Sequence, residues 1–300
     1  MSKTYSRNSV EKNKRIWAYI FLIIPILFYA MIRFYPTLYA FVLSVTDWNI
    51  VSTDLHFVGA SNYTALFNDP LFWLTLQNTF KYVIFGLPIS MLLGFILAYH
   101  INKIHFGEGV FKAMYFIPYI TSMVAVAWVW RWLYQPVPIG AFNNLLSGLG
   151  LPSQGFLMSK SQALPSILAT TIWADLGFQM IIFLAGLKAI SPQYYEAATI
   201  DGANDRQMLF SITFPLLKPT IVFLSVTGMI RYLRIFTQVM NMTYQGEGGP
   251  LNSTKPLVLY IYQSAFQSFK MGYAAAMTVV LFVIILLVTG VQLVVTRNEK

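Results

Sequence analysis

EAATIDGANDRQMLFSITFPLLKP, residues 196–219, is the stretch that decides the fold of this chain. It is a polar interruption between strongly apolar segments, one ending near residue 187 and the next beginning at residue 219. Glu196, Ala197 and Ala198 are good helix formers, and Gly202 allows a sharp turn out of a helix. The pattern predicts a short helix in a polar loop that joins two long apolar helices.

Composition indicates a membrane protein. Of 300 residues, 57% are hydrophobic and 10% are charged, with a mean hydropathy of +0.60, whereas soluble domains carry roughly a quarter charged residues. The absence of cysteine excludes disulfides and thiolate metal sites. The net charge of +9 does not indicate a nucleic-acid partner, because the basic residues cluster at the ends of apolar segments.

Six apolar segments are near or above the ~20 residues that span a bilayer, so they predict six transmembrane helices in a single domain, residues 1–300. The predicted spans are about 16–45, 76–99, 111–133, 164–187, 219–239 and 271–296. Residues 1–15 form a predicted tail without the cleavage site of a signal peptide. Residues 188–218 form the predicted loop.

The distribution of lysine and arginine predicts the orientation. With the N-terminus in the cytoplasm, the inner segments hold twelve of these residues and the outer segments hold four. The inner ones are Lys3, Arg7, Lys12, Lys14, Arg15, Lys103, Lys112, Lys188, Arg206, Lys218, Arg297 and Lys300. The outer ones are Arg131, Lys160, Lys255 and Lys270. Both termini and the loop 188–218 are therefore predicted to be cytoplasmic.

The loop also resembles a known sequence motif. Glu196, Ala197, Ala198, Gly202, Ile212 and Pro215 have the spacing of the EAA loop of bacterial ABC importers, in which Gly follows EAA by four residues and Ile-x-x-Pro follows ten later. In one departure from the pattern, Phe214 stands before Pro215 where Leu is usual, and it remains large and apolar. The resemblance implies that the loop is a cytoplasmic helix that plugs into a separate ATPase.

The resemblance covers nearly the whole chain and is to permeases of the maltose and glycerol-3-phosphate type. It is carried by FVGASNYTAL (57–66), YFIP (115–118), WVWRW (128–132), FLAGLKAI (183–190) and LVLYIYQSAF (257–266). It implies a bacterial inner-membrane subunit that pairs with a second homologous permease. Two copies of an ABC ATPase would lie on one side and an extracytoplasmic solute-binding protein would dock on the other. A carbohydrate is the implied solute, with an oligosaccharide favoured.

Nothing in the chain predicts catalysis. No G-x-x-x-x-G-K-[ST] sequence occurs, so ATP and Mg would be used by the partner ATPase and no cofactor is expected on this chain. His56, His100 and His105 are scattered, so neither a zinc site nor a catalytic triad is predicted.

Charged residues inside the spans are the candidate transport residues. Asp175 lies thirteen residues before Lys188, and Arg231 lies thirteen residues after Lys218, so both are roughly 20 Å from the inner face. We therefore predict that Asp175 and Arg231 face each other, leaving Arg234 available to a translocation cavity. A purely structural role for all three charges remains an alternative.

Aromatic residues near these charges could stack on sugar faces, and Trp173, Tyr232 and Phe236 are the candidates. Packing or interface anchoring is the stronger explanation for each of them in a chain with 16% aromatic residues. Two arginines also leave open an anionic solute, such as glycerol-3-phosphate or a uronic-acid sugar. A membrane enzyme, an ion channel or a secondary transporter would leave the EAA-type loop without a purpose.

Overall fold

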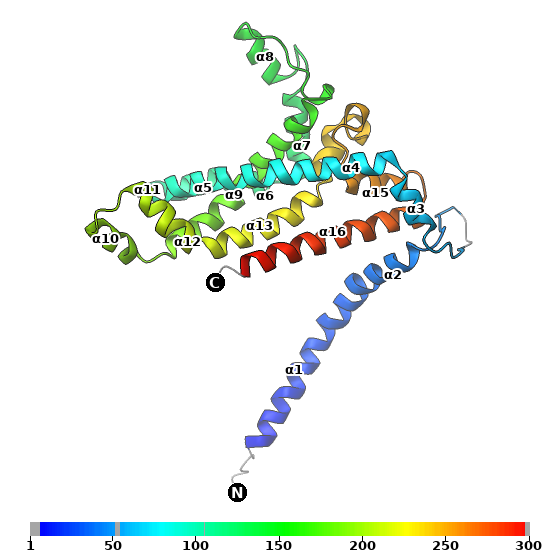
Figure 1. Cartoon of the computed structure of the whole chain (residues 1–300), viewed down its shortest axis with the longest axis horizontal. Helices are drawn as coiled ribbons and strands as arrows, with labels where there is room; N and C mark the ends of the chain where they lie inside the picture. Colours follow the sequence, from blue (N-terminus) through cyan, green and yellow to red (C-terminus); the bar gives the residue numbers. More distant parts are fainter. Residues whose placement is uncertain (1–6, 52–54, 105, 298–300) are drawn as a thin grey trace. The chain divides into compact units, whose positions relative to one another are not determined.

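The computed structural model describes residues 7–51, 55–104 and 106–297, which form helices joined by turns with no strand among them (Figure 1). The α-helices are α1 (Arg7–Tyr29), α2 (Tyr35–Leu43), α3 (Ser61–Phe67), α4 (Pro70–Lys81), α5 (Leu87–Asn102), α6 (Glu108–Ile120), α7 (Met123–Leu133), α8 (Ala141–Gly148), α9 (Ala163–Lys188), α10 (Pro192–Ile200), α11 (Asp205–Met208), α12 (Phe214–Leu216), α13 (Lys218–Leu233), α14 (Thr237–Met242), α15 (Leu257–Phe266) and α16 (Met271–Arg297). Three π-helical turns, η1 (Ala30–Phe34), η2 (Tyr82–Gly86) and η4 (Leu209–Thr213), and three 3-10 turns, η3 (Phe156–Met158), η5 (Tyr244–Gly246) and η6 (Pro250–Asn252), complete the order.

The described residues include four helices that are long and apolar enough to cross a membrane, or up to six if each of two bent helix pairs is one span. The four are Lys14–Leu43, Pro70–Asn102, Ala163–Lys188 and Met271–Thr296. This confirms the predicted all-helical, polytopic class. Residues 1–6 of the predicted tail lie outside the described residues, and the cytoplasmic placement of both termini stays a prediction.

Two predicted spans are not single helices. The third breaks into α6 and α7, which are bent by 95°. The break follows Pro118, and Thr121 and Ser122 adopt extended backbone angles between the two helices. In the fifth, α13 ends at Leu233, short of the predicted residue 239, and α14 begins after an irregular turn.

The second predicted span begins earlier than the predicted residue 76. It starts at Pro70, because Asp69 caps it by accepting a hydrogen bond from the backbone N–H of Leu71 at 2.8 Å. Pro70 suits the first helical position, where a backbone N–H would have no partner within the helix.

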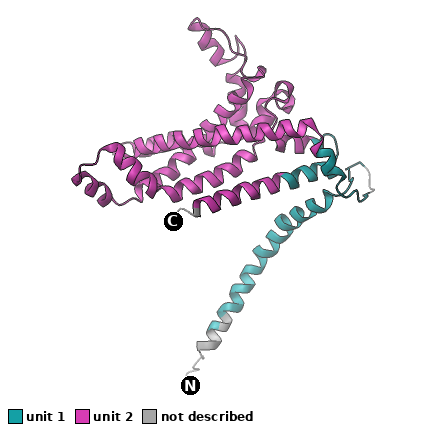
Figure 2. Ribbon diagram, in the orientation of Figure 1, with its two compact units in different colours: residues 1–66, 264–280 teal, residues 67–263, 281–300 magenta. Residues whose placement is uncertain are grey.

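The single predicted domain contains two compact units (Figure 2). One comprises the described residues up to Leu66 together with Ser264–Val280, and the other comprises Phe67–Gln263 with the described residues from Leu281. In the first unit, the apolar helix Lys14–Leu43 buries none of its side chains. Helices that expose apolar surface in this way are stable in lipid or against another protein.

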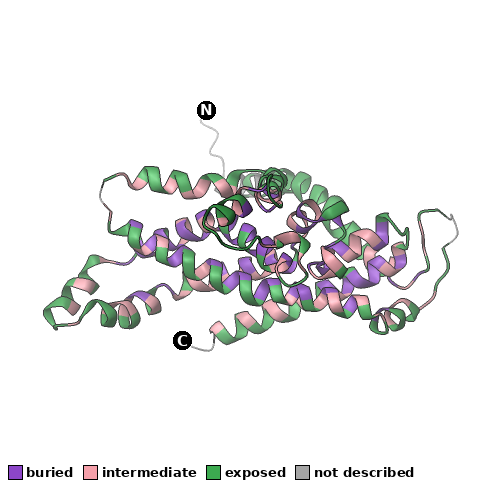
Figure 3. Ribbon diagram, turned by 90° about the horizontal axis from the view of Figure 1, so that it is seen from above, coloured by how far each residue is buried: buried purple, intermediate pink, exposed green. Residues whose placement is uncertain are grey.

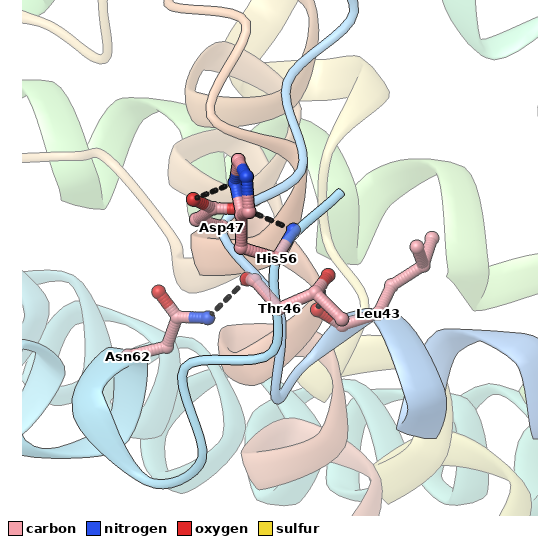
Figure 4. A network of polar contacts seen from close by, with 5 residues as sticks. All are labelled: Leu43, Thr46, Asp47, His56 and Asn62. Atoms are coloured by element: carbon pink, nitrogen blue, oxygen red, sulfur yellow. Dashed lines mark hydrogen bonds and ion pairs between the residues drawn. The ribbon is translucent and has the colours of Figure 1, made fainter. Parts of the chain in front are cut away.

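The first unit is held by polar contacts where α2 ends (Figure 4). Asn62 donates to the carbonyl oxygens of Ser44 at 3.0 Å and Thr46 at 2.7 Å. Asp47 accepts from the backbone N–H of His56 at 2.8 Å and contacts its ring at 3.2 Å. The backbone hydrogen bond from His56 lowers the pKa of Asp47. These contacts order a segment that no regular helix supports.

Helix α9 is the most buried membrane-length helix of the second unit, and α5, α6 and α13 pack around it. Glycines permit the close approach. A Cβ on Gly94 of α5 would lie 2.4 Å from the Cβ of Gln179, and one on Gly177 of α9 would lie 2.2 Å from the carbonyl oxygen of Tyr115. Larger residues at these two positions would push the helices apart.

Each π-helical turn directly precedes a helix with proline in its first two positions. Pro36 follows η1, Pro88 follows η2 and Pro215 follows η4. Proline has no N–H to donate and its ring clashes with the carbonyl four residues earlier, and a wider turn relieves both problems. The helices therefore continue through these prolines instead of ending at them.

The loop between α14 and α15 is packed against α4 and η2. Asn78 donates to the carbonyl oxygens of Asn252 at 2.9 Å and Lys255 at 3.2 Å. Tyr82 donates to the carbonyl of Thr254 at 3.0 Å, and both Asn78 and Tyr82 are fully buried. The loop includes Gln245, Leu251 and Asn252 with positive φ. These contacts hold a backbone conformation that non-glycine residues rarely adopt.

Candidate coupling loop and translocation site

The helix that carries the EAA-type sequence is α10, which begins at Pro192 and stops at a glycine. Gly202 has φ +77°, its N–H bonds to the carbonyl of Thr199 at 3.1 Å, and the N–H of Ala203 bonds to the carbonyl of Ala198 at 2.9 Å. This pair of bonds is the Schellman motif, which glycine favours because its left-handed conformation is unstrained. The helix is therefore short and sharply ended.

The chain then enters a second capped helix. Asn204 and Gln207 form a capping box, with the Gln207 N–H bonded to Asn204 Oδ1 at 2.9 Å and the Asn204 N–H bonded to Gln207 Oε1 at 2.8 Å. Helix α11 and η4 lead to Pro215 in α12, and a bend of 63° separates the helix Asp205–Leu216 from α13. The loop is thus a rigid helix–turn–helix.

Contacts behind α10 fix it to the rest of the second unit. Tyr195 and Thr213 share a hydrogen bond of 3.0 Å between their hydroxyls, and Thr213 is buried. Phe214 stacks at 5.0 Å on Phe95 of α5 and at 5.4 Å on Phe210. The phenylalanine that departs from the motif therefore fills an aromatic contact that a leucine would fill less well.

The loop that carries the residues predicted to meet an ATPase is largely exposed, and the exposed parts of the chain are green in Figure 3. Glu196, Ala197, Gly202 and Pro215 are exposed, and Ala198 and Ile212 are half-buried. Small and acidic side chains on a short exposed helix suit insertion into a groove of another protein.

The structure brings Asp175 of α9 and Arg231 of α13 together. Arg231 Nη1 lies 2.7 Å from Asp175 Oδ1, with the carboxylate 6% exposed and the guanidinium side chain 33% exposed. The guanidinium also lies over the rings of Tyr119 at 5.4 Å and Phe178 at 4.9 Å. Arg234 is exposed at the end of α13.

A cavity of about 420 Å³ opens beside this ion pair. Its lining residues are Tyr119, Thr121, Met123, Ala174, Asp175, Arg231, Thr237 and Gln238. They come from α9 and from both helix breaks, the α6–α7 break at Thr121 and the α13–α14 break before Thr237. Broken helices within membrane proteins line substrate sites because their free backbone groups need polar partners.

The aromatic candidates from sequence lie elsewhere. Trp173 packs on Trp130 at 5.4 Å, Phe236 packs on Tyr262 at 5.2 Å, and Tyr232 is 1% exposed. Neither these three nor Arg234 is among the residues that line the cavity. The aromatic residue that lines it is Tyr119, which stacks on Phe178 at 5.0 Å.

A signal for Tyr119 was present in the sequence. Pro118 interrupts an apolar segment, and the adjacent polar pair Thr121–Ser122 lies in mid-segment. Together they indicate a helix break, and a break in a membrane helix points to a cavity.

Buried polar groups lie next to the ion pair. The Tyr232 hydroxyl interacts with Asp175 and with Ser90, and Ser90, Gln179 and Tyr232 are all buried.

Within the described ranges, no three His, Cys, Asp or Glu side chains group closely enough to hold a metal ion. The polar residues at the cavity instead suit hydrogen bonding to a ligand through hydroxyl, amide and guanidinium groups.

These features are those of a multi-pass membrane protein with an exposed helical loop and a cavity beside two helix breaks. Residues 86–299 match the family model described as the binding-protein-dependent transport system inner membrane component. The chain belongs to this family of ABC transporter permeases. Its members are non-catalytic inner-membrane subunits that work with an ATPase on a separate chain and depend on a solute-binding protein.

Curated relatives of this chain include permeases named for sugar transport. The chain is 33% identical over 302 residues to the lactose transport system permease protein LacF of Rhizobium radiobacter, covering 99% of each chain. It is 30% identical over 289 residues to the arabinooligosaccharides transport system permease protein AraP of Bacillus subtilis, covering 96% of this chain and 91% of the relative. Both relatives are named as permeases of sugar transport systems.

A solved structure shares the fold. A chain of a bacterial alginate ABC transporter, crystallised with an alginate pentasaccharide-bound periplasmic protein, superimposes with a TM-score of 0.84. The two chains are 24% identical, and the match covers 96% of this chain and 97% of the other.

Proposed function

We propose that this chain is one half of a heterodimeric permease that imports an oligosaccharide, driven by two copies of an ABC ATPase. The observation that carries this proposal is the exposed helix α10, closed at Gly202 and fixed from behind through Tyr195. A helix held in this way can pass movement from a partner to the membrane helices. The partner ATPase would bind and use ATP and Mg, and this chain would bind no cofactor.

In the proposed cycle, ATP binding closes the ATPases and moves α10, and the membrane helices rock to face outward. An extracytoplasmic binding protein then releases the sugar into the cavity between the two permeases. Hydrolysis restores the inward-facing state.

The cavity of this chain beside Asp175 and Arg231 supports a neutral solute. Asp175 neutralises Arg231, and the volume of about 420 Å³ falls within the usual range for small-molecule pockets. Tyr119 offers an aromatic face, and Thr121, Thr237 and Gln238 offer hydrogen-bonding groups. We therefore favour a neutral oligosaccharide over the alternative, an anionic solute such as glycerol-3-phosphate or a uronic-acid sugar.

The coupling role is tested by purifying the chain with the subunits encoded beside it and comparing wild type with Glu196→Lys combined with Gly202→Asp. We expect loss of ATPase retention or of sugar uptake while the chain stays folded in the membrane. Unchanged ATPase binding and uptake would refute the coupling assignment. Competition of uptake by neutral and anionic sugars, in parallel, decides the solute class.

A further inference from the structure

Glu108, the first residue of α6, makes two ion pairs with one carboxylate oxygen. Its Oε1 lies 2.6 Å from Lys112 Nζ and 2.5 Å from Lys188 Nζ. Lys112 is one turn along α6, whereas Lys188 is the last residue of α9. An acidic residue at the start of one helix and a basic residue at the end of another each complement the dipole of their own helix. The second ion pair therefore joins two helices at favourable ends.

The α9 end of this bridge is close to the coupling helix in the chain. Only Ala189, Ile190 and Ser191 separate Lys188 from Pro192, where α10 begins. The N–H of Ala189 bonds to the carbonyl of Ala185 at 3.1 Å, and Ile190 is buried. This connection is short, hydrogen-bonded and packed, so a movement of α10 moves the end of α9.

The α6 end of the bridge leads to the cavity. Helix α6 contacts α9 closely at Gly177, and Tyr119 near its other end stacks on Phe178 and lines the cavity. Helix α6 ends at the 95° break, so it is not continued by α7 and can pivot as a separate rod. The close backbone contact between Gly177 and Tyr115 would serve as the pivot, and the ion pair would set the position of the free end.

We propose that Glu108 is a positioning residue that couples α10 to the cavity wall, through its ion pair with Lys188. The inference rests on the proposed function, because it takes α10 to be the helix that an ATPase moves. When α10 moves, the Lys188–Glu108 pair carries the start of α6 with the end of α9. Tyr119 then shifts at the cavity.

The two lysines provide a matched pair of variants. Lys188→Met and Lys112→Met each remove one cation from the same carboxylate oxygen, but only Lys188→Met disconnects the two helices. A third variant, Glu108→Lys with Lys188→Glu in the Lys112→Met background, restores the interhelical pair with its charges exchanged.

The chain has no cysteine, so spin labels attach only where cysteine is introduced. We would replace exposed Met114 on α6 and exposed Leu92 on α5 by cysteine in the complete importer, with partner subunits made cysteine-free. Electron–electron double resonance gives the α5–α6 distance without nucleotide and after trapping with ATP and vanadate. ATPase retention is measured on the same samples.

We expect trapping to shift the distance in wild type, in Lys112→Met and in the charge-exchanged variant. In Lys188→Met the shifted fraction should fall at least threefold while the ATPase stays bound. The inference would be overturned if Lys188→Met and Lys112→Met behaved alike, or if the exchanged charges failed to restore the shift. It would also be overturned if wild type showed no shift with the ATPase bound. Each of these outcomes would leave the proposed function standing. Loss of the ATPase from wild type would instead refute the proposed function, and the inference with it.

Discussion

Replacing Arg231 by methionine is expected to destabilise the chain more than replacing Asp175 by asparagine, although both changes break the same ion pair. Asp175 is 6% exposed in its side chain and Arg231 is 33% exposed. Removing the guanidinium leaves a buried carboxylate without its partner, a change that costs about 3 kcal/mol. Methionine also removes the guanidinium from the Tyr119 and Phe178 rings, but the unpaired buried carboxylate is the larger loss.

Asp175→Asn should cost only about 1 kcal/mol. The amide oxygen can still accept a hydrogen bond from Arg231, and the guanidinium retains its exposure to the cavity and its two aromatic neighbours. The double variant Asp175→Asn with Arg231→Met should be more stable than Arg231→Met alone, by about 2 kcal/mol, since it contains no unpaired buried charge.

Resistance to SDS-induced unfolding in mixed micelles, followed by tryptophan fluorescence, provides the free energies. If Asp175→Asn proves as damaging as Arg231→Met, or if the double variant loses the sum of both, the assigned role of burial is wrong. In uptake assays, exchanging the two residues as Asp175→Arg with Arg231→Asp should recover transport that either single reversal abolishes.

Three further predictions follow from local geometry. Gly202→Val should destabilise the end of α10 by about 1–2 kcal/mol, because residue 202 has a positive φ that valine tolerates poorly. The expected readout is faster amide hydrogen exchange in the loop. Unchanged exchange would contradict the Schellman assignment. Asn78→Ala should lower the free energy of unfolding by about 1–3 kcal/mol, since one part-buried and one buried carbonyl lose their donor. Asn144→Ala, which removes one exposed hydrogen bond, should have little effect. Equal losses of unfolding free energy in the two variants would contradict this. Asp47 should order its segment at neutral pH, and protection of the His56 amide from hydrogen exchange should be lost as the pH falls through the lowered pKa of the carboxyl. Asp47→Asn should show no such pH dependence. Unaltered wild-type protection at acidic pH would count against the contact.

The sequence alone predicted the class of helical membrane protein and the short helix in the loop 188–218. A bilayer requires long apolar helices, so length and composition placed most of the membrane helices to within a few residues. Helix ends in the loop follow from local chemistry, since Gly202 and the Asn204–Gln207 pair need only near neighbours to act as caps. The level of Asp175 and Arg231 also followed from counting, because the rise along a helix is constant.

The cavity was decided by tertiary structure. Whether Trp173 or Tyr119 faces the ion pair depends on how α6 crosses α9 at Gly177, and that crossing involves residues some sixty positions apart in the chain. The same holds for the bridge from Glu108 to Lys188 across eighty positions. A membrane helix that is apolar on all sides shows no hydrophobic periodicity, so its sequence does not indicate which side faces the other helices. Only the packing of the helices selects which side chains meet.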